Sequence, residues 1–235
     1  MILSIHQPSY FPWLGLLDKI AKTDSFVLLD DNQVVKGTYQ YRNIFFCNGK
    51  AKYLTLPINY TLGIGFNKLE FKNDNWPDKH LETLRNYYLK APHFNEVFDD
   101  LKSLFANFKH SSPIEVLKSS MQFCFEKLDI RVEFHLGSKI PYTGKKADMV
   151  LEICKHLEAD RYLAGSGSYD YMHSELNKFE ASGLEVIWHK FSHPVYPQHP
   201  KFEFVEGLSA LDIFFFEGYK QASKIFWSNL YNHDA

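Results

Sequence analysis

Residues 2–31 read ILSIHQPSYFPWLGLLDKIAKTDSFVLLDD, and this stretch decides the fold. An apolar run ending at His6 is followed by a proline-bearing connection, by Leu14, Leu17 and Ile20 at helical spacing, and by a second apolar run that ends at Asp30. Continuous apolar strands on both sides of a helix favour parallel pairing, because both faces of such a strand are buried. The stretch therefore predicts a β-α-β unit whose strands end at one edge of a sheet.

A second unit of the same kind follows later in the chain. Alternating apolar residues at 130–134 predict a strand, helical spacing covers 147–157, and a strand at 162–164 runs into Gly-Ser-Gly-Ser at 165–168. Between the two units the patterns predict a strand at 53–58 and helices at 81–89, 94–108 and 112–128. The last of these helices begins with an N-cap serine, a proline and a capping-box glutamate.

In the remaining chain, the pattern of apolar residues predicts a strand at 184–188 and helices at 208–216 and 219–235. Between them lies a segment rich in proline and histidine at 189–200, which is too broken for regular structure. We interpret that segment as a long surface loop or a lid.

Together these elements predict an α/β fold: a predominantly parallel sheet flanked by helices, with a helical insertion between two β-α-β units. No internal repeat, low-complexity tract or clean linker interrupts the chain. We therefore expect a single α/β domain over 1–235, with the insertion at about 79–128.

Composition narrows the classes of function. A net charge of −2 offers no basic surface, so we expect small-molecule ligands and no nucleic-acid partner. The start of the chain lacks a basic region followed by a long apolar run, and the 3 cysteines form no CxxC pair. We therefore expect a cytoplasmic protein with reduced cysteines and no membrane insertion. Aromatic residues make up 17%, which is typical of ring-lined clefts for flat or sugar-like ligands.

The octapeptide HQPSYFPW at 6–13 is the most unusual stretch of the chain. A histidine at the carboxyl end of a first strand can act as acid, base or phosphate partner. Two prolines would hold Gln7, Tyr10 and Trp13 against a ligand, although an aromatic plug that seals the core is the alternative. Ligands gather at strand carboxyl ends in open α/β sheets, so we favour a catalytic role for His6.

Asp30 and Asp31 stand where the second apolar strand stops. Adjacent residues at a strand end point to opposite sides, so at most one of them easily faces the cleft. Asp30 with His6 could form a catalytic acid/base pair or hold a divalent ion, and Asp31 could bind substrate. The alternative is an Asx-type turn with solvated charges.

Arg42 and Asn43 lie among tyrosines just before another apolar run. We expect both to bind substrate, because a guanidinium can form paired hydrogen bonds with a phosphate or carboxylate. An edge-strand salt bridge is the equally ordinary alternative for Arg42.

Gly165, Ser166, Gly167 and Ser168 follow a predicted strand. Their N–H groups could cradle an anion or an oxyanion, with Ser166 as a catalytic group. The stretch is no dinucleotide fingerprint, because Asp170 replaces the third glycine. A plain tight turn is the alternative.

The segment at 189–200 contains three histidines together with Tyr196 and Gln198. Histidines at irregular spacing, without cysteine or acid partners, fit zinc poorly, so no metal site is predicted. We favour a lid that lays Tyr196 and Gln198 over the cleft as substrate-binding residues, with a simple surface loop as the alternative.

In combination these motifs resemble the WbqC-like protein family nearly from end to end. The motifs that carry the resemblance are IHQPSYFPW at 5–13, Asp30 with Asp31, Arg42 with Asn43, YLAGSG at 162–167, Tyr196 with Gln198, and LSALD at 208–212. Members of this family occur among genes for bacterial O-antigen and related surface polysaccharides. The resemblance implies a cytoplasmic step on a nucleotide-linked sugar or its substituent.

Surface-sugar pathways commonly acylate an amino sugar, which requires a base for the amine and N–H donors for the tetrahedral oxyanion. His6 and the loop at 165–168 fit these roles, and Arg42 or the pair Lys145 and Lys146 could bind a diphosphate. The favoured interpretation is a transferase that places an acyl or aminoacyl group on a nucleotide-linked amino sugar. The sequence identifies no cofactor.

Two alternatives stay open. A nucleotide-dependent activating enzyme of the nucleotidylyl-transfer type would also use a histidine at the end of the first strand, but the second histidine of an H-x-G-H motif is absent after His6. The other alternative is a non-catalytic binding subunit of the pathway, whose aromatic surface docks a partner.

Overall fold

The computed structural model describes residues 1–232, and the chain divides into two compact units. The first unit holds residues 1–7, 18–31 and 130–191, and the second holds 8–17, 32–129 and the chain from 192 onward. Each unit is therefore assembled from segments that are distant in sequence. That the two units act as a single domain stays a prediction.

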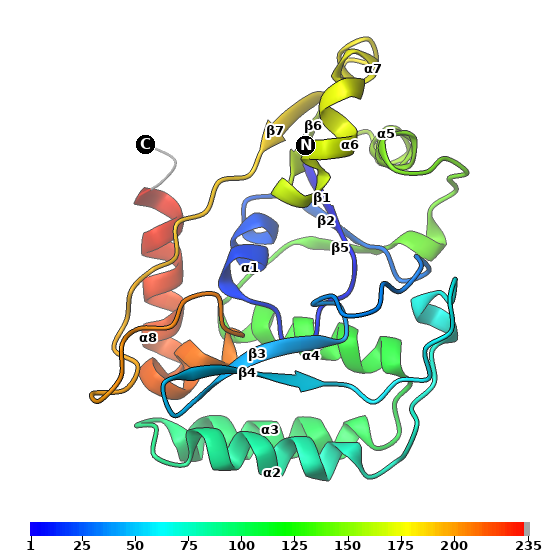
Figure 1. The fold of residues 1–235 in the computed structure, drawn as a ribbon. Helices are drawn as coiled ribbons and strands as arrows, with labels where there is room; N and C mark the ends of the chain where they lie inside the picture. The colour runs from blue at the N-terminus through cyan, green and yellow to red at the C-terminus, as the bar shows by residue number, and fades with distance from the viewer. Residues whose placement is uncertain (233–235) are drawn as a thin grey trace. The chain divides into compact units, whose positions relative to one another are not determined.

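The first unit is built on a five-stranded sheet in the order β5-β2-β1-β6-β7, in which every pairing is parallel (Figure 1). Its strands are β1 (Ile2–His6), β2 (Ser25–Leu28), β5 (Glu133–Leu136), β6 (Arg161–Ala164) and β7 (Glu185–Trp188). β1 has a parallel neighbour on each side, which accounts for its buried and mostly apolar sequence. The α/β fold with a predominantly parallel sheet is confirmed.

One face of this sheet is covered by α5 (Ala147–His156), α6 (Tyr169–Met172) and α7 (Leu176–Glu180). Alternate strand residues point to that face, as the pleat requires. The buried side chains that meet there include Leu3, Ile5, Val27, Tyr162, Val150, Ile153, Met172 and Phe179. Short helical turns follow β5, β6 and α6, namely η2 (Gly137–Lys139), η3 (Ser166–Ser168) and η4 (His173–Glu175). α1 (Leu14–Ala21) connects β1 to β2, and its last turn belongs to this unit.

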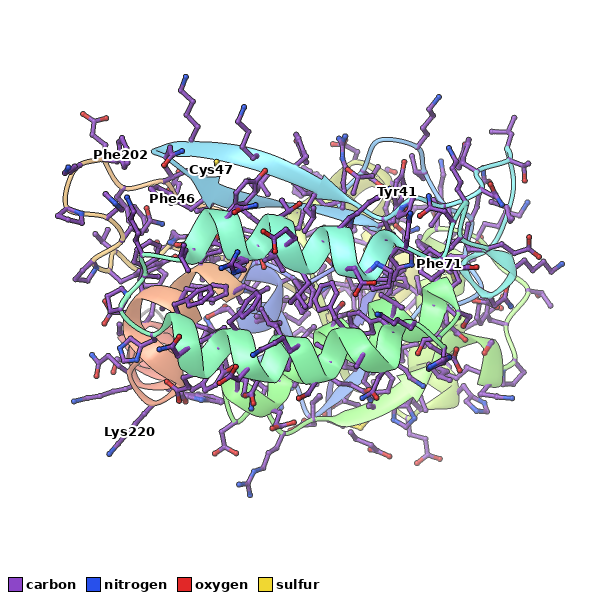
Figure 2. The ribbon with its side chains drawn as sticks, turned by 90° about the horizontal axis from the view of Figure 1, so that it is seen from below. Tyr41, Phe46, Cys47, Phe71, Phe202 and Lys220 are labelled. Atoms are coloured by element: carbon purple, nitrogen blue, oxygen red, sulfur yellow. The ribbon has the colours of Figure 1, made fainter. Side chains whose placement is uncertain are left out.

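The second unit packs helices against a β-hairpin. β3 (Arg42–Cys47) pairs antiparallel with β4 (Lys50–Thr55), and the helical elements are η1 (Phe66–Lys68), α2 (Trp76–Tyr88), α3 (Phe94–Phe108), α4 (Pro113–Lys127) and α8 (Leu211–Asn232). Figure 2 shows α2 and α3 side by side; it labels Tyr41, the residue before β3, and Cys47, the last residue of that strand. Aromatic rings fill the core of this unit; Tyr88 and Phe215 stack with their centroids 4.2 Å apart.

Two predicted strands are placed differently by the structure. The strand expected at 130–134 begins only at Glu133, whose N–H donates to the carbonyl oxygen of Asp24 at 3.0 Å and so starts the pairing with β2. The strand expected at 53–58 is β4, which begins and ends earlier. Residues 50–53 are all exposed, so this part of the strand has no buried face.

The predicted helices are largely confirmed. Where a helix begins depends on local capping residues, as the helix at 113–127 shows. The capping box is present: the N–H of Ser112 donates to the Glu115 carboxylate at 2.7 Å. The helix expected at 81–89 begins earlier, at Trp76. The two helices expected at 208–216 and 219–235 form α8, which is interrupted at Gly218; the last residues of that range, 233–235, lie outside the described chain.

Within the described chain, none of the helices combines the length and the apolar character that crossing a membrane requires.

Gly218 provides a test of packing in the second unit. Its φ of 70° and ψ of 164° suit only glycine, and a Cβ there would lie 2.6 Å from Nδ1 of His93. Gly218→Ala should therefore lower the free energy of unfolding by about 1–3 kcal/mol, measured by urea denaturation. Gly207→Ala is the matched control, because Gly207 has a φ of +73° but nothing within 4 Å of the added Cβ. Equal losses in the two variants would contradict the clash with His93.

Candidate functional site

The carboxyl ends of the parallel strands meet at one edge of the first unit's sheet. His6 ends β1, Asp30 follows β2, and the loop at 165–168 follows β6. Because β2 and β5 lie on one side of β1 while β6 and β7 lie on the other, the winding reverses between β1 and β6. Ligands of open α/β sheets bind at such a switch point. We call His6, Gln7 and residues 165–168 the β1–β6 edge.

His6 is held as a neutral imidazole with a defined tautomer. Its Nδ1 lies 2.7 Å from the carbonyl oxygen of Gln7, so this nitrogen is the donor and carries the proton. Desolvation by burial, together with the nearby ammonium of Lys19, lowers the pKa of His6 to about 4. At pH 7 the ring is uncharged, and Nε2 holds the lone pair that can accept a hydrogen bond or a proton.

The loop at 165–168 is fixed by its last residue. The N–H and the Oγ of Ser168 donate to the carbonyl oxygen of Gly165, at 3.0 Å and 2.7 Å, and close the turn η3. Ser166 and Gly167 are exposed within this turn. The first N–H groups of a helical turn have no partner inside it, so those of Ser166 and Gly167 can donate to an anion.

Asp30 and Asp31 both lie at the edge, where each has a partner. The two carboxylate oxygens of Asp30 accept hydrogen bonds from the N–H and the Oγ of Ser138, at 2.9 Å and 2.7 Å. Asp31 accepts one from the hydroxyl of Tyr142 at 2.8 Å. The Asp30 contacts tie β2 to the turn after β5; they are long-range contacts of a buried carboxylate and not the local, solvated Asx-type turn of the alternative. A catalytic role for Asp30 and a binding role for Asp31 stay predictions.

Sequence reasoning missed two charged side chains in the last turn of α1. Asp18 and Lys19 are only 2% and 4% exposed. Oδ1 of Asp18 lies 2.6 Å from Nε2 of His189, the residue after β7, and 3.5 Å from Nζ of Lys22. Nζ of Lys19 donates to the carbonyl oxygen of Ile5 at 2.9 Å. The signal was available, because a helix that is apolar almost all round is buried together with its charges.

Tyr10 and Asn43 form an internal network of the second unit. Tyr10 is fully buried, and its hydroxyl lies 3.1 Å from Nδ1 of His80. Asn43 Nδ2 donates to the carbonyl oxygens of Tyr10 and Phe11, at 3.2 Å and 2.7 Å. These contacts match the aromatic-plug alternative for residues 8–13. Ligand binding by Tyr10 or Asn43 stays a prediction.

Trp13 and Arg42, also in the second unit, are more accessible. Trp13 is 38% exposed, and its ring lies against Gly15. The guanidinium of Arg42 stacks 4.2 Å from the ring centre of Tyr53, and its Nη2 donates to the carbonyl oxygen of Gly37. Arg42 therefore makes a cation–π contact in the hairpin. The binding roles of Trp13 and Arg42 stay predictions.

Tyr196 and Gln198 anchor their segment through a buried carboxylate. Asp212, which has no exposed surface, accepts hydrogen bonds from the hydroxyls of Tyr88 and Tyr196, at 3.1 Å and 2.8 Å, and from Nε2 of Gln198 at 2.8 Å. Gln198 also bonds to both backbone groups of Val205. The segment lacks regular structure, as expected, and its two predicted binding residues are used inside the second unit. Substrate binding by them stays a prediction.

The histidines at 193 and 199 have other contacts. Nδ1 of His193 lies 2.8 Å from the carbonyl oxygen of Pro194, and the ring of His199 stacks on Phe46. Over residues 1–232, no group of three or more His, Cys, Asp or Glu side chains is arranged to hold a metal ion.

A parallel sheet whose strand order reverses between β1 and β6 defines the chain as an open α/β protein, with polar groups gathered at that switch point. The chain matches the WbqC-like protein family over residues 7–224, and it belongs to that family. It is also 23% identical to the uncharacterized protein Rv1507c of Mycobacterium tuberculosis. The 218 aligned residues cover 91% of this chain and 92% of that protein. No solved structure matches the chain significantly.

The Asp212 network predicts a dependence of stability on pH. Burial raises the pKa of Asp212 to about 7, well above the value of about 3.9 for an unfolded chain. The proton on the Asp212 carboxyl is bound more tightly in the folded than in the unfolded chain. Its contribution to the free energy of unfolding is fully present below about pH 4 and is lost as the pH rises to 7. The unfolding free energy of Asp212→Asn relative to the wild type should therefore increase between pH 4 and 7 in urea titrations. A difference that stays constant with pH would contradict the raised pKa.

Proposed function

We propose that the protein is a transferase that places an acyl or aminoacyl group on a nucleotide-linked amino sugar during synthesis of a bacterial surface polysaccharide. The supporting observation is the parallel pairing of β1 with β6, because it brings the neutral imidazole of His6 and the loop at 165–168 to neighbouring strand ends. The pathway comes from the family, whose members occur among genes for O-antigen and related polysaccharides.

In this reaction the amine nitrogen of the sugar attacks the carbonyl carbon of an ester or thioester donor. A C–N bond forms, and the carbonyl oxygen becomes an oxyanion. Nε2 of His6 takes the proton from the attacking nitrogen and returns it to the leaving oxygen or sulfur as the bond to the carbonyl carbon breaks. With a pKa lowered to about 4, the imidazole of His6 is a weak base at pH 7, and the imidazolium formed in between releases its proton readily to the leaving group.

The loop at 165–168 would stabilise the oxyanion. Ser166 and Gly167 are exposed, and the N–H groups that begin η3 are donors without partners inside the turn. Fixed donors directed at a developing negative charge lower the barrier without reorganisation during the reaction. Gln7, next to His6 and partly exposed, would contact the substrate.

The test is acyl transfer to a UDP-linked amino sugar, followed by mass spectrometry with a panel of acyl-thioester and aminoacyl-ester donors. With a donor that supports turnover, His6→Ala should lower kcat by about 10²- to 10⁴-fold, because it removes the base. Ser166→Ala should lower kcat by about 10- to 100-fold, because the mechanism gives its hydroxyl a part in stabilising the oxyanion. His156→Ala is the matched control, since His156 is an exposed histidine of the same unit at the end of α5. Wild-type turnover in both His6→Ala and Ser166→Ala would refute the mechanism.

The second candidate is a nucleotide-dependent activating enzyme. It is favoured by the position of His6 at the end of β1, in the centre of the sheet, which also suits adenylyl transfer. This activity would release pyrophosphate from a nucleoside triphosphate in the presence of a carboxylic acid. A coupled assay for pyrophosphate separates the two candidates, because acyl transfer from a preformed ester or thioester releases none.

A further inference from the structure

Lys19 is a buried cation at the carboxyl end of β1. Its side chain extends from the last turn of α1, and Nζ donates to the carbonyl oxygen of Ile5 at 2.9 Å. The side chain is 4% exposed, and across residues 1–232 it forms no ion pair with a carboxylate. An ammonium has three N–H donors, and one carbonyl oxygen uses only one of them. A buried charge without a counterion is strongly destabilising, so Lys19 lowers the stability of the folded protein.

The adjacent acid does not neutralise Lys19. Asp18 is paired with His189 at 2.6 Å and with Lys22 at 3.5 Å. Successive residues of a helix point in directions about 100° apart, which places the two side chains on different sides of α1. His6, the other ionisable group that interacts with Lys19, is held neutral by its lowered pKa. The positive charge therefore remains uncompensated.

Gly165 leaves space beside this ammonium. Its φ of −80° and ψ of 159° are open to any residue, so the backbone does not require glycine here. A Cβ at this position would lie 3.7 Å from Nζ of Lys19 and 3.8 Å from its Cδ. Because Gly165 has no side chain, the space beside Nζ of Lys19 stays open. A ligand atom placed there would contact the ammonium. Ser166 and Gly167, which follow, are exposed, so this position is close to solvent.

We propose that the ammonium of Lys19, together with the space at Gly165, forms an anion site that binds a phosphate group at the β1–β6 edge. A lysine ammonium binds phosphate as a point charge, and ligands of open α/β sheets bind at the point where the strand order reverses, here between β1 and β6. The phosphate supplies the counterion that the fold lacks. This inference is independent of the acyl donor and of the transfer reaction.

Calorimetric titration with pyrophosphate at low ionic strength tests the site. The wild type should bind, and Lys19→Met should bind about 10- to 100-fold more weakly, because a charge-assisted hydrogen bond is lost. Without ligand, Lys19→Met should melt at the same temperature as the wild type or higher, because methionine fills the volume without a buried charge. A purely structural lysine would give the opposite result: a lower melting temperature and unchanged binding.

Lys22→Met is the matched control. Lys22 lies one turn further along the chain and is paired with Asp18, so this variant should keep wild-type affinity for pyrophosphate. Gly165→Ala provides a second test that does not alter the charge. Its added Cβ makes only ordinary contacts, so the variant should fold, and it should bind pyrophosphate more weakly because the position beside Nζ is filled.

Parallel titrations with inorganic phosphate and with UDP separate the sources of the phosphate group. Tighter binding of UDP than of pyrophosphate would assign the site to a nucleotide, and the reverse would assign it to an inorganic anion. The proposal is overturned if the wild type binds none of the three, or if Lys19→Met and Gly165→Ala both retain wild-type affinity. None of these outcomes depends on detecting acyl transfer, so failure of the proposed reaction is distinguished from failure of the anion site.

Discussion

The parallel pairing of β1 with a neighbour on each side is the constraint on which the first unit depends. The register places Leu3 opposite Ser25 on one side and Tyr162 on the other, so three strands run together and end at one edge. Strands buried on both faces are mostly apolar; the buried Ser4 inside β1 is paired with the Thr23 hydroxyl, and the ionisable groups appear where the strands stop. His6 and the loop at 165–168 stand at such ends. The backbone pairing of the strands thus places His6 and the loop at 165–168 at the same edge of the sheet.

Desolvation then decides the ionisation of the groups at that edge. Burial keeps His6 neutral, with its proton on Nδ1 and its lone pair on Nε2. The same burial surrounds Lys19, which has a carbonyl oxygen as partner and no carboxylate among the described residues. Asp18, one residue earlier, is satisfied by His189 and Lys22. In the proposed reaction the neutral imidazole of His6 moves a proton, and in the proposed anion site the ammonium of Lys19 binds a phosphate.

The sequence predicted those elements whose formation depends mainly on one local or burial pattern. The central strands β1, β2 and β6 could be predicted because they are buried and mostly apolar, and the helix at 112–128 because its capping box is local. Exposure concealed the start of β4, and pairing with β2 placed β5 later than its alternation indicated. For the site, Tyr196 and Gln198 were predicted to bind substrate, but their partner Asp212 lies in a later element that local patterns do not connect to them. Lys19 was missed because lysine is normally exposed, although the apolar surroundings of α1 indicated its burial.

Amide hydrogen exchange with and without pyrophosphate tests most directly the claim that ligands bind where β1 and β6 end. Bound ligand should slow exchange in peptides that cover residues 5–7 and 164–168. The first unit also has a groove lined by α7 and the start of β7, between residues 176 and 186, at the amino end of that strand. Slowed exchange confined to 176–186, with unchanged exchange at 5–7 and 164–168, would contradict the account.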